Sequence, residues 1–163
     1  MTIAEDELAV RDLAARYADA VNRRDAEGMA ALFASDGIIE KPGFGDPVQG
    51  KEKILKRYKR LQRERDFLAQ MIQSGVVEIE GKTAKARWWF SEIKNIRDSD
   101  QWLYMIGVYQ DQAIKLDAGW RFARRSQTTV FETDLNSADL RKFPLPNFIS
   151  LVAGADMPIG RET

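Results

Sequence analysis

Apolar residues recur at three- and four-residue steps in the first part of the chain and at every second residue in the later part. The first pattern predicts an amphipathic helix over about residues 4–22, with Tyr17 on its apolar stripe. Asp25 is a good N-cap for a second, short helix, which we expect to stop at Asp36-Gly37. The other elements expected in this part are a strand at 38–41, a loop at 42–50 and a helix over about 51–68.

The alternating pattern of the later part predicts extended strands. Three long strands are expected at 83–93, 102–116 and 120–131, separated by turns at 96–101 and 117–119. Strands joined by short turns form an antiparallel meander. Helices gathered before such a meander give the α+β class, with the helices on one face of a curved sheet.

Length and composition favour one self-contained domain. The chain has 163 residues, of which 44% are hydrophobic, and this is enough for a core and a pocket. Its 25 acidic residues balance 25 basic residues, so nucleic acid is not expected as a partner, because proteins that bind it usually carry a basic patch. A net charge of zero also favours self-association, and we expect a homodimer or a homotrimer.

Cysteine and histidine are both missing from the sequence. Without cysteine there is no disulfide, no thiol nucleophile and no zinc–thiolate site. Without imidazole a transition-metal site is not expected either, and we predict no metal and no organic cofactor. The acidic start of the sequence does not read as a signal peptide, and no apolar run approaches the roughly 20 residues of a membrane span. We therefore expect a cytoplasmic protein that does not bind membranes.

Three segments carry a distinctive order of residues. They are ARYADAVNRRD in the first helix, SDGIIEKPGFGDPVQG around the following strand and loop, and GVYQDQAIKLDAGWRFARR in the later hairpin. This order resembles the nuclear transport factor two-like superfamily, in particular its SnoaL-like and ketosteroid isomerase-like branches. The resemblance implies an α+β barrel, in which a cone-shaped, curved antiparallel sheet wraps around N-terminal helices and encloses an apolar pocket. Residues 1–135 would form this barrel, and residues 136–163 a tail, with a short helix at 137–142, that docks on the pocket mouth or on a subunit interface.

The same resemblance implies which residues face the pocket. In ketosteroid isomerases the positions matched by Tyr17 and Asp111 hydrogen-bond a developing oxyanion. The proton-abstracting aspartate of those isomerases falls at Lys41, and the Asp–His dyad of scytalone dehydratase-like lyases falls at Asn22 and Gln70. The familiar bases are therefore absent. The chain is expected to be neither a steroid isomerase of the known type nor an Asp–His dehydratase.

Each candidate catalytic residue has a structural alternative. Tyr17 is either an acid in the pocket or a core tyrosine whose hydroxyl meets a polar partner. Asp111 leaves its strand on the same side as Tyr109, because side chains two residues apart share a face. It is either a donor or base in the pocket or the partner in an ion pair with Arg124 or Arg125.

Lys41 ends the first predicted strand. If an apolar pocket desolvates it, its amine becomes a base or a Schiff-base former, and otherwise it is a surface lysine paired with Glu40 or Asp46. Trp88 and Trp89 must lie on opposite faces of their strand, so one of them is expected to face the pocket. The residues expected to contact a ligand are Asn22, Gln70, Tyr109, Trp88, Phe44 and Tyr58.

These observations favour a cofactor-independent enzyme. We expect acid/base elimination, such as dehydration or retro-aldol cleavage, of a hydrophobic and aromatic small molecule, with Tyr17 as acid and Asp111 or Lys41 as base. An isomerase of a similar substrate is the first alternative. A small-molecule-binding protein without turnover and an oligomerisation module are the others, because the familiar bases are absent and the fold also associates through its open sheet face.

Overall fold

The computed structural model describes residues 2–135, which form three helices and six strands. The helices are α1 (Ile3–Asn22), α2 (Ala26–Ala31) and α3 (Lys51–Arg63). The strands are β1 (Phe33–Glu40), β2 (Val48–Gln49), β3 (Leu68–Glu80), β4 (Thr83–Asn95), β5 (Trp102–Leu116) and β6 (Gly119–Asp134). The predictions for residues 136–163, a short helix and a docking tail, lie outside the described residues.

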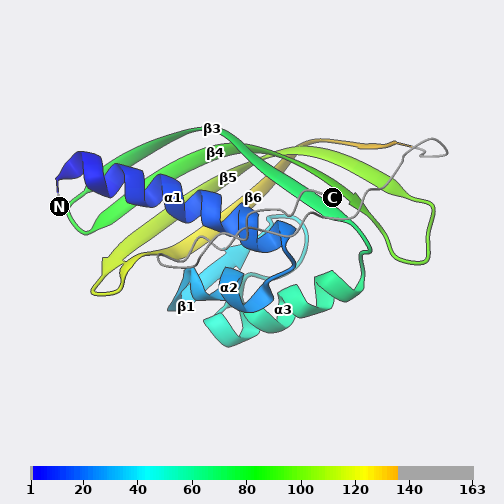
Figure 1. Cartoon of the computed structure of the whole chain (residues 1–163), viewed down its shortest axis with the longest axis horizontal. Helices are drawn as coiled ribbons and strands as arrows, with labels where there is room; N and C mark the ends of the chain where they lie inside the picture. Colours follow the sequence, from blue (N-terminus) through cyan, green and yellow to red (C-terminus); the bar gives the residue numbers. More distant parts are fainter. Residues whose placement is uncertain (1, 136–163) are drawn as a thin grey trace, which may run out of the picture.

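The six strands form one curved, unclosed sheet in the order β2-β1-β6-β5-β4-β3. Strands β3 to β6 form an antiparallel meander, in which β4, β5 and β6 are the three predicted strands. The helix α1 lies across the concave side of these long strands (Figure 1). The helices α2 and α3 are grouped with β1 at one side of the sheet (Figure 1). The α+β class and the curved sheet are therefore confirmed. The sheet is not purely antiparallel, because β1 pairs with β6 in parallel.

The helix α1 begins and packs as its sequence predicts. Thr2 and Glu5 form a capping box that satisfies free backbone N–H groups of the first turn. The apolar stripe, with Val10, Leu13 and Tyr17 among its buried residues, is turned toward the sheet. This burial places the Tyr17 side chain in the interior rather than in solvent.

The boundary between α2 and β1 differs from the prediction. The helix ends at Ala31 and the strand begins at Phe33, so Asp36 and Gly37 lie within β1 instead of ending the helix. Pairing of Phe33 with Phe122 on β6 overrides the local helical preference. Glycine is required at position 37, because an added Cβ would lie 2.9 Å from the carbonyl oxygen of Phe122.

The helix α3 ends at Arg63, five residues before the predicted boundary at Leu68, which begins β3. Arg24, whose φ of 60° is in the left-handed region, explains this end of the helix. Its guanidinium donates hydrogen bonds to the carbonyl oxygen of Gln62 and to those of Arg65 at 3.0 Å and Asp66 at 3.4 Å. The chain that leaves α3 is thereby held to the connection between α1 and α2.

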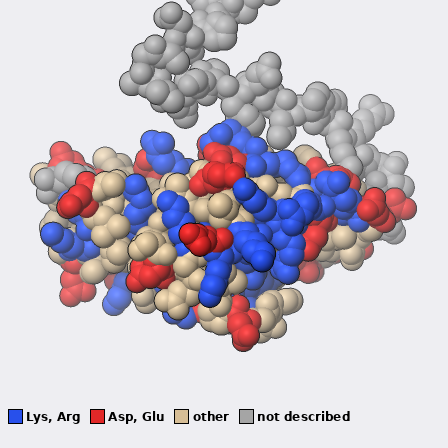
Figure 2. Space-filling view, turned by 90° about the horizontal axis from the view of Figure 1, so that it is seen from below, with Lys and Arg blue, Asp and Glu red and all other residues tan. Residues whose placement is uncertain are grey.

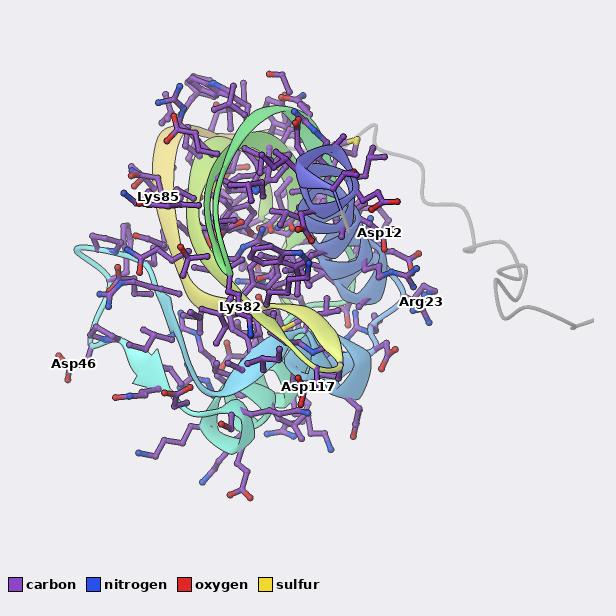
Figure 3. All side chains as sticks on the ribbon, turned by 90° about the vertical axis from the view of Figure 1, so that its left-hand side faces the viewer. Asp12, Arg23, Asp46, Lys82, Lys85 and Asp117 are labelled. Carbon is purple, nitrogen blue, oxygen red and sulfur yellow. The ribbon has the colours of Figure 1, made fainter. Side chains whose placement is uncertain are left out.

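Side chains of β4 alternate between an inward face, which packs against α1, and an outward face. Trp88 and Phe90 are buried on the inward face, whereas Trp89 is outward and 41% exposed. Figure 3 shows the same division, with Lys85 on the outer side of the sheet, Asp12 on the solvent side of α1 and the core between them.

Two glycines make room for the large inward side chains. An added Cβ at Gly75 would lie 2.0 Å from Cε3 of Trp88, and one at Gly107 would lie 2.6 Å from the ring of Phe90. Both glycines sit beside irregularities in the strand pairing. The curvature and the seating of the inward aromatic residues therefore depend on the absence of two side chains.

A buried carboxylate ties the start of α1 to the hairpin between β5 and β6. Asp6 pairs with Nζ of Lys115 at 2.7 Å and accepts a hydrogen bond from Nε1 of Trp120 at 2.8 Å. The contact with Lys115, followed by that with Trp120, lowers the pKa of Asp6 below its usual value. This cluster closes the end of the sheet that lies away from α2 and α3.

The surface charge is unevenly distributed although the net charge is zero. Seven of the thirteen residues of α3 are lysine or arginine. Figure 2 views the molecule from below, the side on which α3 lies in Figure 1, and shows basic residues gathered over much of this face. None of the helices described is long and apolar enough to cross a membrane.

Candidate functional site

Asp111 and Arg125 form a buried ion pair on the inward face. Nε and Nη2 of Arg125 donate to the two carboxylate oxygens of Asp111 at 2.8 and 2.6 Å. Nε1 of Trp88 donates a third hydrogen bond to Asp111 at 2.8 Å. The structure therefore shows the ion-pair alternative for Asp111, with Arg125 as partner. Its neighbour Arg124 instead pairs with Glu40 at 2.6 Å.

Three aromatic rings surround the guanidinium of Arg125. Its Cζ lies 4.1 Å from the ring centroid of Tyr17, 4.2 Å from that of Tyr109 and 4.1 Å from that of Phe122. Such cation–π contacts are strong when the cation is desolvated. Burial alone would lower the pKa of Arg125, but Asp111 and the surrounding hydroxyls raise it above the ordinary value.

Tyr17 lies at the centre of the inward aromatic residues. Its ring makes edge-to-face contacts with Tyr58, Tyr109 and other rings, and its hydroxyl is hydrogen-bonded to the hydroxyl of Tyr58. Burial raises the pKa of Tyr17 to about 12 and raises the pKa of Tyr109 well above its usual value. Both hydroxyls therefore keep their protons at neutral pH and act as hydrogen-bond donors rather than bases.

A strip of buried polar side chains continues the inward face beyond the aromatic residues. Nε2 of Gln70 donates to Oε2 of Glu92 and to the hydroxyl of Tyr109, both at 2.9 Å. Nζ of Lys94 lies 3.1 Å from Oε1 of Glu92 and 3.7 Å from Oε2 of Glu132. Gln70, Glu92 and Lys94 are all buried.

Sequence reasoning did not find Glu92 and Lys94. The signal was present in the alternation, because residues 88, 90, 92 and 94 share one face of β4. An apolar face that continues as two opposite charges is unusual in a core strand. This change marks the point at which the inward face of β4 passes from apolar side chains to charged side chains.

Asn22 and Gln70, the positions matched to a familiar dyad, lie side by side. The Asn22 side chain accepts from the backbone N–H of Gln70 and donates to its carbonyl oxygen, both at 2.7 Å. Asn22 is thus occupied with the backbone of β3 at the end of α1. The Gln70 side chain is left free to reach the interior.

Lys41 follows the last residue of β1 on the inward side. Ile39 is buried and pairs with Arg125, so Lys41, two residues later, continues the same face toward Glu92 and Lys94. Burial lowers the pKa of Lys41, and the positive charge of Lys94 lowers it further, against smaller opposite effects of nearby glutamates.

The surface ion pairs considered for Lys41 are not formed. Glu40 pairs with Arg124, and no carboxylate of residues 2–135 lies within ion-pair distance of Lys41. Its Nζ instead lies 4.1 Å from the ring centroid of Phe44. Phe44 is 67% exposed, so it covers Lys41 from outside and does not line the interior as predicted.

The sites predicted from the sequence are thus only partly brought together. The structure joins Tyr17, Tyr58, Tyr109, Gln70 and Trp88 on one inward face, with Asn22 at its edge and Lys41 at its open end. A cavity of about 30 Å³, room for about one water molecule, lies beside Tyr58 between the helices and the start of β3. Residues 2–135 contain no group of three or more acidic residues placed to share a metal ion.

A larger groove of about 430 Å³ lies on the outward face, across the sheet from these residues. Both signs of charge line it, which makes the surface complementary to itself. The charged residues with outward side chains that line it are Glu40, Glu78, Lys85, Arg87 and Arg124. The inward polar strip lies on the other side of the sheet from this groove.

Comparison with known proteins agrees with this architecture. The pattern that defines the SnoaL-like domain family matches residues 2–126. An uncharacterized protein of Mycobacterium tuberculosis is 25% identical over 136 residues, which cover 81% of this chain and 92% of that protein. The chain therefore belongs to the SnoaL-like domain family.

Two solved structures share its fold. A hexachlorocyclohexane dehydrochlorinase of Novosphingobium barchaimii is 17% identical, with a TM-score of 0.74 and coverage of 85% of this chain and 94% of that one. A ketosteroid isomerase-like protein of Erwinia carotovora atroseptica is 20% identical, with a TM-score of 0.68 and coverage of 78% of this chain and 98% of that one. The two structures support the fold, and the family match over residues 2–126 places this chain among the SnoaL-like proteins.

Proposed function

We propose that the protein is a cofactor-independent lyase that eliminates water, or cleaves a carbon–carbon bond by retro-aldol chemistry, in a hydrophobic aromatic small molecule. The observation that carries this proposal is the buried polar strip of Gln70, Glu92 and Lys94, which is joined to the Tyr109 hydroxyl through Gln70. Buried ion pairs contribute little to stability, since the desolvation of both charges offsets their attraction. A chemical role is therefore the better account of their position.

Lys41 is the base in this proposal. Asp111, the other candidate, receives three hydrogen bonds from Arg125 and Trp88 and has no free position from which to reach a substrate. Lys41 continues the inward face, has a lowered pKa and pairs with no carboxylate of residues 2–135. A lowered pKa increases the fraction of neutral amine at physiological pH, which is the form that removes a proton.

Tyr17 and Tyr58 supply the hydrogen bonds that stabilise negative charge on a substrate oxygen. The two hydroxyls are bonded to each other, and Tyr58 is only half-buried, so this pair leads from the core toward the cavity beside Tyr58. A tyrosine with a pKa of about 12 remains a neutral donor throughout the reaction. The guanidinium of Arg125, which is paired with Asp111, positions the Tyr17 ring through its cation–π contact.

The names of the two structural neighbours support elimination or isomerisation as reaction classes, since one is a dehydrochlorinase and the other a ketosteroid isomerase-like protein. An isomerase of a similar substrate is the nearest alternative, because both reactions begin with removal of a proton beside an activating group. Association into a homodimer or homotrimer through the outward groove belongs to the same proposal.

A binding protein without turnover is the second candidate. Asn22 and Gln70 favour it, because both carry carboxamides that cannot accept a proton near neutral pH. The two functions differ in what Lys41 does. It is essential for turnover in an enzyme and dispensable for affinity in a binding protein.

The test uses 3-hydroxy-1,3-diphenylpropan-1-one as substrate. Dehydration yields chalcone and water, whereas retro-aldol cleavage yields benzaldehyde and acetophenone, so one chromatogram separates the two reactions. Wild type should form one product set, Lys41→Met and Tyr17→Phe should lower kcat by about 100-fold or more, and the outward control Lys85→Met should not. Binding without product in the wild type would favour the binding protein.

A further inference from the structure

The carboxamide of Gln70 contains a buried acceptor without a hydrogen-bond partner. Its Oε1 atom is inaccessible to solvent and meets no donor in the described part of the chain, while the residue as a whole is 3% exposed. Native proteins satisfy nearly all buried polar atoms, so an exception calls for an explanation.

The orientation of this carboxamide is fixed by its surroundings. The Gln70 amide nitrogen faces the Glu92 carboxylate, which accepts but cannot donate, so nitrogen and oxygen cannot be exchanged without losing that bond. The same nitrogen donates to Tyr109, and Asn22 holds the backbone of Gln70 on both sides. Oε1 is therefore held in place before any ligand arrives.

The second unpartnered atom of the interior has a different explanation. Nη1 of Arg125 also lacks a hydrogen bond among residues 2–135, but the guanidinium is covered by three aromatic faces at 4.1–4.2 Å. Cation–π attraction offsets the missing acceptor there. No cation–π contact of this kind accounts for the unpaired Oε1 of Gln70.

We propose that Gln70 is the residue that determines specificity for a hydroxyl group, with Oε1 accepting a hydrogen bond from a phenolic substrate. This inference rests on the proposed function and names its substrate class, a hydroxylated aromatic carbonyl compound. The carbonyl oxygen lies toward Tyr58, and the hydroxyl lies toward Gln70. A compound without the hydroxyl leaves Oε1 unpaired and binds less tightly.

The test compares 6-hydroxy-1-tetralone with 6-methoxy-1-tetralone, whose methyl group removes the donor. Titrations followed by calorimetry should show about tenfold tighter binding of the hydroxyl compound to the wild type. In Gln70→Met the two compounds should bind within about twofold of each other. Gln73→Met is the matched control, since Gln73 is exposed on the same strand and should leave the preference unchanged.

The outcomes separate this inference from the function on which it rests. Equal affinity of the wild type for both compounds, or a preference that survives in Gln70→Met, would overturn the role of Gln70 and leave the lyase proposal standing. An internal water that satisfies Oε1 would give this result.

If neither compound binds while 3-hydroxy-1,3-diphenylpropan-1-one is turned over, only the proposed role of Gln70 is refuted. If no compound binds or reacts, both proposals are refuted. Should Gln70→Met not fold, Gln70→Asn, which withdraws the acceptor by one methylene, must reduce the preference.

Discussion

Asp111 on β5 and Arg125 on β6 lie directly opposite each other and share two hydrogen bonds, with side chains that are 1% and 0% exposed. Replacement of Asp111 by asparagine leaves the guanidinium buried without a counter-charge. We expect the free energy of unfolding to fall by about 3–5 kcal/mol in urea titrations. The matched control is Asp12→Asn, which breaks an exposed pair with Arg16 and should cost less than about 1 kcal/mol. Similar small losses in the two variants would contradict this account of the buried pair.

The lowered pKa of Lys41 makes stability depend on pH. The window lies between the lowered pKa of Lys41 in the folded state and the ordinary lysine pKa of 10.5. At a pH in this window the unfolded chain binds more protons than the folded chain. Stability contributed by this residue therefore rises with pH through that window. The difference in unfolding midpoint between wild type and Lys41→Met should change as the pH rises toward 10.5, in favour of the wild type at higher pH.

The outward residue Lys85 provides the control for this pH dependence. Lys85→Met removes the same charge from the surface, so its unfolding midpoint should keep a constant offset from the wild type. If turnover is found, the rise of kcat/KM with pH in the wild type should disappear in Lys41→Met. A pH dependence shared by both lysine variants would argue against a special environment at Lys41.

Tyr17 should ionise only in strongly alkaline solution. Its pKa of about 12, against an ordinary value of 10.0, means that the folded state resists loss of this proton. This raised pKa stabilises the folded state by about 3 kcal/mol. The stabilisation is fully present below pH 10 and is lost as the pH rises through the pKa of Tyr17 in the folded state. Tyrosinate absorbance should show a component with a midpoint near 12 that Tyr17→Phe removes. A titration of all tyrosines near 10 would refute it.

Gly107 should not tolerate a side chain. An added Cβ would lie 2.6 Å from the Phe90 ring and 2.7 Å from the carbonyl oxygen of Thr128. Overpacking of this kind costs about 1–3 kcal/mol, which we expect for Gly107→Ala in chemical denaturation. Phe90→Leu should recover part of this loss in the double variant, because it removes one of the two obstructions. Purely additive effects would mean that the ring is not what excludes the side chain.

Much of the fold follows from the sequence because local and tertiary preferences agree. The stripe of α1 and the alternation of β4 each follow one period over most of the element. The limits of α2 and α3 do not follow in this way. Pairing of Phe33 with Phe122 and the hydrogen bonds of Arg24 decide them, and both involve residues distant in sequence.

The inward position of Arg125 is a further feature that the sequence does not predict. Alternation from Phe122, which is buried, would turn Arg124 inward. A shift in the pairing of β5 with β6 between Gln112 and Ala113 adds one residue to β6, so that Arg125 faces inward instead. No local feature of the sequence predicts this shift. The choice between the two arginines therefore required the structure.

Trp88 and Trp89 are neighbours in the chain but belong to separate environments, one facing the interior and the other the outer surface. Substitutions at alternate positions of one strand therefore fall on different properties of the molecule. A substitution at an outward position changes the outer surface of the sheet, and one at an inward position changes the core. A single strand thus allows the surface and the interior of this protein to be changed independently, by substitutions at alternate positions.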